Sequence, residues 1–233
     1  MDKKSVSFVF PMFNEAKSIA DTIRRATKLA REMADDYEIV VVDDASTDGS
    51  AGALERIASG DSHIKPVFLK KYTKFGGALK EGLRRTSKDV VIYTDSDFPA
   101  KEDDIKRALE MLDGADIVTA YSLVVKDASL KRIMMSRVYN WLVQTLFGLS
   151  IKDINSGLKI YRRGCIKDLD LISMSPFVDV EIFAECARRG CVIRQYGLIF
   201  DLRTAGVSSI SRPGVVARTF RDMLWYKCLR PWR

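Results

Sequence analysis

Short apolar segments alternate with amphipathic segments along the first half of the chain. Runs rich in β-branched and aromatic residues predict buried strands at residues 6–10, 38–42, 67–69 and 90–93, the first of them ended by Pro11. Between these runs, apolar residues recur every three or four positions, which predicts helices near residues 19–30, 50–59 and 78–85. Strands that are apolar throughout and joined by helices are typical of a mostly parallel sheet with helices on both faces. We therefore expect an α/β fold.

The second half of the chain has a less regular pattern. A helix over residues 103–112 and a strand over 117–121 continue the alternation, and a basic stretch spans residues 126–137. Residues 138–149 are apolar on nearly every side, which favours a buried helix on the back of the sheet, with lipid contact as the alternative. Further strands are expected at residues 158–162 and 192–200, with a helix at 178–189 between them.

Most of the net charge of +7 lies at the C-terminal end, where residues 202–233 hold seven basic residues and one acidic residue. Pro213 and Gly214 set off a tail, residues 213–233. One helical face of this tail contains Val216, Phe220, Met223, Leu224 and Lys227. A basic amphipathic helix of this kind fits an anionic membrane surface, and packing on the domain is the alternative. We do not expect nucleic acid as a partner, because the chain has no nucleic-acid-binding signature.

Several kinds of site are excluded by the residues present. His63 is the only histidine, so histidine-based catalytic triads and multi-histidine metal sites are not available. The four cysteines lack the paired short spacings of a zinc site, and we expect them to be reduced thiols in a cytoplasmic protein. The chain has no phosphate-binding P-loop, and we expect neither a signal peptide nor a membrane-spanning segment.

Carboxylates at strand ends are the remaining candidates for chemistry. Asp95 and Asp97 follow one predicted strand, and Asp43 and Asp44 follow another. The carboxyl ends of parallel strands meet at one edge of a sheet, where ligands bind in such folds. Aspartate pairs bind hard divalent cations, which complete their coordination with substrate phosphates. The pattern indicates a site for Mg²⁺ or Mn²⁺ and a diphosphate.

The segments that carry these residues resemble a known family. PMFNE at residues 11–15, VVVDDASTDGS at 40–50, KFGGALKEGL at 74–83 and YTDSD at 93–97 are similar to the nucleotide-sugar half of family 2 glycosyltransferases, which have the GT-A fold. DINSGLKIYRR at 153–163 and FVDVEIFAECARRG at 177–190 resemble the dolichyl- and polyprenyl-phosphate mannose and glucose synthases. The resemblance implies a domain over residues 1–212, with a nucleotide-sugar half at 1–97 and an acceptor half at 98–212.

The resemblance also implies roles for individual residues. The donor would contact Pro11, Phe13, Glu15, Val42, Asp44, Gly76, Asp95, Ser96 and Asp97. Asp95 and Asp97 would hold the metal and, together with Asp153, form the catalytic set, while Asp179 and Glu181 are further polar candidates. A phosphate acceptor needs cations rather than a base, because its second pKa near ~6 leaves it dianionic at neutral pH. The candidate phosphate-binding cations are Lys131, Arg132, Arg137, Lys159, Arg203 and Arg212.

The expected function is metal-dependent, inverting transfer of a hexose from a nucleotide sugar to a lipid phosphate. The donor would be GDP-mannose or UDP-glucose, and the acceptor a polyprenyl or dolichyl phosphate at the cytoplasmic face of a membrane with which the protein associates peripherally. One alternative is a soluble enzyme of the same family that acts on a glycan hydroxyl and needs a carboxylate base. The other is a non-catalytic protein that binds a nucleotide sugar or nucleic acid.

Overall fold

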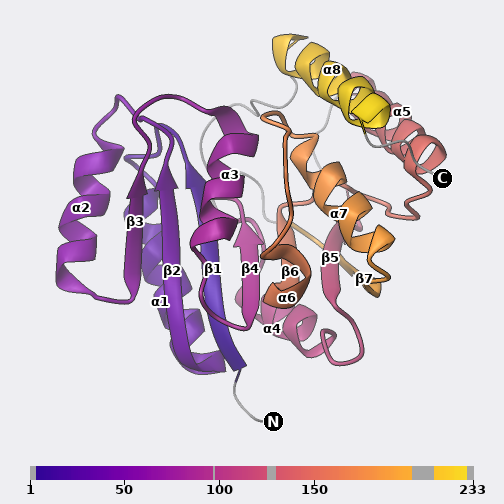
Figure 1. The fold of residues 1–233 in the computed structure, drawn as a ribbon. Coiled ribbons are helices and arrows are strands. Elements are labelled where there is room, and N and C mark those ends of the chain that lie inside the picture. The colour runs from indigo at the N-terminus through magenta and orange to yellow at the C-terminus, as the bar shows by residue number, and fades with distance from the viewer. Residues whose placement is uncertain (1–3, 97, 125–129, 201–212, 230–233) are drawn as a thin grey trace.

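The computed structural model describes residues 4–96, 98–124, 130–200 and 213–229. Within them, the core is a seven-stranded sheet with the strand order β3-β2-β1-β4-β6-β5-β7 (Figure 1). All strands run in parallel except β6, which is antiparallel to both β4 and β5. The strands are β1 Lys4–Met12, β2 Ala34–Asp43, β3 Ile64–Phe68, β4 Val90–Thr94, β5 Ile117–Ser122, β6 Leu158–Arg162 and β7 Ile193–Leu198. The expected α/β fold with a mostly parallel sheet is confirmed.

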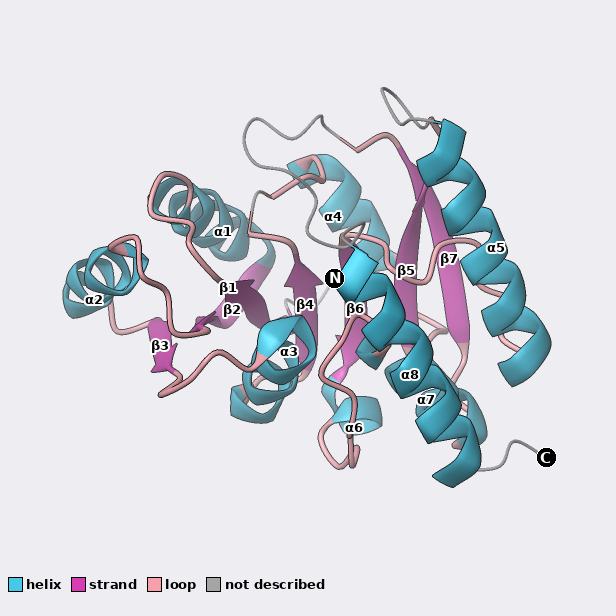
Figure 2. Cartoon of the chain, turned by 90° about the horizontal axis from the view of Figure 1, so that it is seen from above, coloured by secondary structure: helices cyan, strands magenta, loops and turns pink. Residues whose placement is uncertain are grey.

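Helices cover both faces of this sheet. They are α1 Ile19–Met33, α2 Ser50–Gly60, α3 Lys74–Arg85, α4 Glu102–Glu110, α5 Leu130–Phe147, α6 Arg163–Ile166, α7 Val178–Arg188 and α8 Pro213–Leu229. Figure 2 shows α1, α2 and α4 on one side and α3, α6, α7 and α8 on the other. Phe8 and Phe10 point into the first hydrophobic core and Val9 points into the second. Two buried faces explain why residues 8–10 of β1 and 39–42 of β2 are apolar in succession.

Strand boundaries differ from the expected ones where only one neighbour is present. β1 continues through Pro11 to Met12 instead of ending before the proline. Beyond Val9 this strand pairs only with β2, because its pairing with β4 ends at that residue. A residue that lacks the N–H donor is tolerated where one side of the strand has no partner.

The apolar segment expected as a core helix is only partly buried. Val143 and Phe147, near the end of α5, lie in the second core. Met134, Val138 and Trp141 are exposed, Trp141 at 61%. Within the predicted segment, residues 138–149, the prediction of a buried helix is therefore wrong at Val138 and Trp141.

The C-terminal helix packs on the domain with one face. Met223 and Tyr226 of α8 are buried, and the Tyr226 ring contacts those of Phe147 and Phe177. The Tyr226 hydroxyl donates to Glu185 of α7 at 2.5 Å. Leu224 and Trp225 are exposed. Leu224 therefore does not share the buried position of Met223, with which the sequence pattern groups it. In the described parts of the chain, no helix combines the length and the apolar character needed to cross a membrane.

Candidate active site

The antiparallel strand β6 brings the two halves of the chain together at one edge of the sheet. The carboxyl ends of β1, β2 and β4 lie at this edge, and so do residues 153–157, which precede β6. The Thr94 hydroxyl donates to the Gly157 carbonyl oxygen at 2.8 Å. A Cβ atom on Gly157 would lie 3.1 Å from Oδ2 of Asp95, so a glycine allows this close approach. Asp95 thus lies beside the segment that contains Asp153.

Unusual backbone conformations gather at the same edge. Among the described residues, positive φ angles occur outside glycine at Asn14 (58°), Ala45 (58°), Lys74 (66°) and Phe98 (48°). Asn14, Ala45 and Phe98 follow the ends of β1, β2 and β4, and Lys74 begins α3. Such conformations cost energy, persist where the surroundings fix them, and are common at functional sites. Their position supports this edge as the active site.

The loops after β1 and β2 are tied together by hydrogen bonds. The Asn14 backbone N–H donates to the Ser46 hydroxyl at 2.9 Å, and the Thr47 N–H donates to Oδ1 of Asn14 at 2.8 Å. The Glu15 N–H donates to the Ser50 hydroxyl at 2.8 Å. These bonds fix the segment that contains the predicted donor residues Pro11, Phe13 and Glu15.

Asp44 connects the end of β2 to the loop before α3. Its carboxylate is buried, and Oδ1 accepts the Thr73 backbone N–H at 2.6 Å and the Thr73 hydroxyl at 2.8 Å. Burial raises the pKa of Asp44 above its ordinary value, the two bonds from Thr73 oppose that rise, and the neighbouring Asp43 adds to it. Asp44 therefore holds this loop in place whether or not it also contacts a ligand.

An exposed pair of aromatic rings lies beside these loops. The rings of Phe13 and Tyr72 are 4.4 Å apart between centroids, and the two residues are 41% and 53% exposed. Tyr72 was not among the residues predicted from the sequence, because it lies in a polar turn without periodicity. Exposed aromatic faces at a ligand-binding edge can stack on a planar base.

Two predicted donor residues are placed by packing. The side chain of Val42 is fully buried in the second core. Gly76 lies in α3, and its backbone N–H donates to the Met174 carbonyl oxygen at 3.1 Å. A Cβ atom there would lie 2.7 Å from the Ser173 carbonyl oxygen, so only glycine allows α3 to approach this loop. Contact between either residue and a donor stays a prediction.

The described part of the predicted metal site offers carboxylate oxygen atoms, which are hard ligands. Oδ1 of Asp95 accepts the Tyr93 hydroxyl at 2.6 Å, which orients the carboxylate. The Ser96 carbonyl oxygen accepts the Thr22 hydroxyl, and Asp97 lies outside the described residues. Carboxylate oxygens without nitrogen or sulfur ligands fit Mg²⁺ or Mn²⁺.

A buried ion pair lies behind Asp95. Lys159 is fully buried, with its Nζ atom 3.1 Å from Oδ2 of Asp179 and 4.9 Å from the centroid of the Tyr93 ring. The same Nζ donates to the Ser156 carbonyl oxygen at 2.7 Å, and Asn155 donates to Asp179 at 3.3 Å. Burial raises the pKa of Asp179 to about 6, against the opposing effect of Lys159.

This pair changes the interpretation of Lys159. The sequence predicts Lys159 to be one of the cations for a phosphate acceptor, and a solvent-exposed position is the ordinary one for lysine. The structure instead buries its ammonium group against Asp179, so its charge is already compensated. Lys159 therefore has a structural role, in which it holds Asp179 and the Ser156 carbonyl group next to the active site.

The other predicted residues divide into those that the structure places and those that it does not describe. Glu181 is buried and accepts the backbone N–H groups of Ile172 (2.7 Å) and Ser173 (2.9 Å), which fixes the loop against Gly76. Asp153 is partly exposed at the active-site edge, and Arg137 is exposed on α5. The positions that lie outside the described residues are Asp97, Arg203, Arg212 and the side chains of Lys131 and Arg132.

Comparison with known proteins gives the family. Residues 7–170 match the family described as Glycosyl transferase family 2. The chain therefore belongs to this family.

Relatives within the family carry a more specific name. The chain is 34% identical over 160 residues to the undecaprenyl-phosphate 4-deoxy-4-formamido-L-arabinose transferase of Pseudomonas fluorescens (strain SBW25), covering 68% of this chain and 47% of that protein. The protein of the same name from Salmonella choleraesuis (strain SC-B67) is 32% identical over 165 residues, covering 70% of this chain and 50% of that protein. The chain spans about half the length of these relatives.

Solved structures confirm the GT-A fold. Glucosyl-3-phosphoglycerate synthase from Mycobacterium tuberculosis, in complex with Mn²⁺, uridine diphosphate and phosphoglyceric acid, superimposes with a TM-score of 0.72. The match covers 99% of this chain and 80% of that chain at 20% sequence identity. At this identity, the likeness concerns the fold.

Proposed function

We propose that this protein transfers a sugar from a nucleotide-diphosphate donor to a polyprenyl phosphate at a membrane surface. The names of the relatives support a polyprenyl-phosphate acceptor. The observation that carries the proposal is the close approach of Gly157, which precedes β6, to Asp95 and Thr94 at the end of β4. A transferase needs its two substrates to meet at such a junction.

The donor would bind along the carboxyl ends of β1, β2 and β4. Phe13 and Tyr72 provide ring faces for the base, and the neighbouring loops are fixed before any ligand arrives. Asp95, together with Asp97, would hold Mg²⁺ or Mn²⁺ at the diphosphate. When bound, such a cation neutralises the charge that develops on the leaving nucleoside diphosphate.

The acceptor would approach from the side of residues 153–157. A phosphate monoester is largely dianionic at neutral pH, so its oxygen can attack the anomeric carbon without a protein base. Attack from the face opposite the leaving diphosphate inverts the configuration at that carbon. The transferred sugar is proposed to be a hexose, from GDP-mannose or UDP-glucose.

Helices α5 and α8 supply a surface for membrane association. Trp141 on α5 and Leu224 and Trp225 on α8 are each more than 60% exposed, and Arg137 and Arg221 are exposed on the same two helices. The ends of these helices are joined, because Nζ of Lys227 donates to the Leu146 carbonyl oxygen at 2.7 Å. Exposed tryptophans and leucines beside basic residues favour binding at an anionic lipid interface. We propose that the protein lies peripherally at the cytoplasmic face of the membrane.

A donor screen tests the proposed function. The protein would be incubated with undecaprenyl phosphate, Mn²⁺ or Mg²⁺, and one nucleotide sugar at a time: GDP-mannose, UDP-glucose, UDP-N-acetylglucosamine or UDP-4-deoxy-4-formamido-L-arabinose. The expected result is that one donor gives a glycolipid product, and that excess EDTA abolishes its formation. Transfer only to soluble glycans would instead favour an enzyme acting on a hydroxyl, and binding of a donor without transfer to any acceptor would favour a non-catalytic protein.

A further inference from the structure

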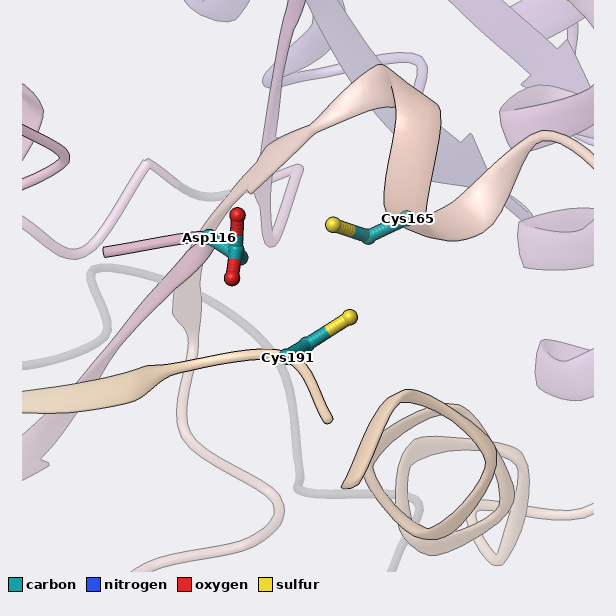
Figure 3. A group of neighbouring side chains, drawn as sticks. All are labelled: Asp116, Cys165 and Cys191. Atoms are coloured by element: carbon teal, nitrogen blue, oxygen red, sulfur yellow. The ribbon is translucent and has the colours of Figure 1, made fainter. Parts of the chain in front are cut away.

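A second group of metal-ligating side chains lies at the opposite edge of the sheet. Asp116 precedes β5, Cys165 lies in the short helix α6 that follows β6, and Cys191 lies between α7 and β7. Because β6 is antiparallel, its carboxyl end reaches the edge where β5 and β7 begin. Figure 3 shows the carboxylate and the two sulfur atoms pointing toward a common space. The site is therefore remote from Asp95.

The geometry of these three side chains suits a cation. One carboxylate oxygen of Asp116 and the Sγ atoms of Cys165 and Cys191 all lie within 4.8 Å of one another. Around a tetrahedral Zn²⁺, with bonds of about 2.0–2.3 Å, such ligand atoms are roughly 3.5–3.8 Å apart. Small side-chain rotations would close that difference. All three residues are partly exposed, so an ion can enter from solvent.

We propose that Asp116, Cys165 and Cys191 bind a thiophilic divalent cation of the Zn²⁺ type. The sequence analysis sets a zinc site aside because the cysteines lack paired short spacings. The fold brings together ligands from three separate segments, which no local spacing can reveal. Thiolates and carboxylates are both zinc ligands, and three protein ligands with a fourth position for water are typical of open zinc sites.

The surroundings of the site favour the bound state. The Val192 backbone N–H donates to Oδ2 of Asp116 at 2.8 Å, which orients the carboxylate as outer contacts do in known metal sites. Zn²⁺ with two thiolates and one carboxylate carries a net charge of −1. The positive charge of Arg162, which interacts with Cys165, would stabilise that anionic complex. The Arg162 guanidinium is itself held by the carbonyl oxygens of Leu112 (2.8 Å) and Ala115 (2.9 Å).

Binding would exchange protons for the metal. Each thiol would release its proton to solvent as its sulfur–metal bond forms. The bound ion would link β5, α6 and the start of β7, and so stabilise the fold. Soft sulfur ligands distinguish this site from the oxygen site at Asp95, which suits Mg²⁺ or Mn²⁺.

Cobalt is a suitable probe, because its spectrum reports thiolate ligands. The full chain, reduced and stripped of metal, would be titrated with Co²⁺. The expected result is one tightly bound equivalent with sulfur-to-cobalt charge-transfer and tetrahedral ligand-field bands, displaced by Zn²⁺. Excess Mg²⁺, which prefers oxygen ligands, should leave the bands unchanged. Cys165→Ser and Cys191→Ser should each lose the charge-transfer bands or reduce them strongly, and Asp116→Asn should weaken binding by at least about tenfold.

Cys228→Ser is the matched control, because Cys228 is exposed on α8, which is not part of the site. It should leave the spectrum unchanged. If a variant fails to fold, alkylation of the wild-type protein provides the second measurement: Zn²⁺ should protect Cys165 and Cys191 from iodoacetamide but not Cys228. Reduced protein that gives no thiolate bands, or bands that persist in Cys165→Ser and Cys191→Ser, would overturn the proposal. So would a Cys165–Cys191 disulfide that forms in air in a protein whose reduced form takes up no metal.

Discussion

The two sides of the candidate active site are held in different ways. On the side where we propose that the donor binds, polar side chains bond to backbone N–H groups of neighbouring loops, as Asp44 does with Thr73 and Asn14 with Thr47. On the side of the proposed acceptor, the support is the buried ion pair of Lys159 and Asp179. Oδ1 of Asp179 and the hydroxyl of Tyr161 are buried without a hydrogen-bond partner among the described residues. The first arrangement spreads its stabilisation over many bonds, whereas the second concentrates it in two charges.

The largest effect is expected where the two sides meet. Asp95→Asn should reduce the rate of sugar transfer at least about a thousandfold, because it removes a charged group from the proposed metal site, where its contribution would be several kcal/mol. Asp97→Ala should act in the same way. The matched control is Asp113→Asn, since Asp113 pairs with Lys4 at the opposite edge of the sheet. Full activity of Asp95→Asn in a steady-state assay would remove this carboxylate from the mechanism.

The next largest effect concerns the ion pair. Lys159→Met should lower the free energy of unfolding by about 3–5 kcal/mol, because it leaves Asp179 buried without its charged partner. The double variant Lys159→Met/Asp179→Leu should recover much of that loss. Lys4→Met breaks a pair that includes a largely exposed carboxylate and should cost no more than about 1 kcal/mol. Urea denaturation measures all three, and equal losses for Lys159→Met and Lys4→Met would contradict the contrast between the two sides.

On the donor side, a single substitution should have a smaller effect. Asp44→Ala should weaken binding of the nucleoside diphosphate about tenfold or more, because it removes both the proposed contact with the nucleoside and the two hydrogen bonds that hold the loop at Thr73. Hydrogen bonds to a charged group contribute about 1.5–3 kcal/mol each. Thr73→Val removes only the hydroxyl bond and should weaken binding less. Isothermal titration calorimetry of both variants measures the difference. An unchanged dissociation constant in Asp44→Ala would place the nucleoside elsewhere.

The smallest effect is expected at the membrane surface. Trp141→Ser or Trp225→Ser should each reduce binding to anionic liposomes roughly tenfold, since each removes an exposed aromatic side chain that would bury apolar area in the interface. Both residues are exposed in the protein, so neither change should alter folding. Tyr72→Ser, which removes an exposed ring at the active-site edge, is the control. Co-sedimentation that is unaffected by both tryptophan changes would contradict membrane binding through α5 and α8.

The sequence predicts the first half of the fold well, because the central residues of its strands are buried on both faces and are therefore apolar, as at residues 39–42 of β2. The direction of β6 has no such signal, since a strand has the same periodicity whichever way it runs. From the sequence, residues 153–157 are therefore assigned to the active site only through the resemblance to a family. The burial of Lys159 depends on Asp179, which is distant in the sequence. The uniform apolarity of residues 138–149 predicts burial on all sides, yet α5 packs mainly through its last turns.

The central proposal is that the acceptor is a polyprenyl phosphate, and one comparison tests it most directly. Wild-type protein, a donor identified by screening and Mn²⁺ would be given undecaprenyl phosphate in one reaction and undecaprenol, which ends in a hydroxyl, in another. We predict transfer to the phosphate and none to the alcohol, because a dianionic phosphate attacks without a base. Equal transfer to undecaprenol, or transfer only to the alcohol, would show that the site activates a hydroxyl and would contradict the proposed acceptor.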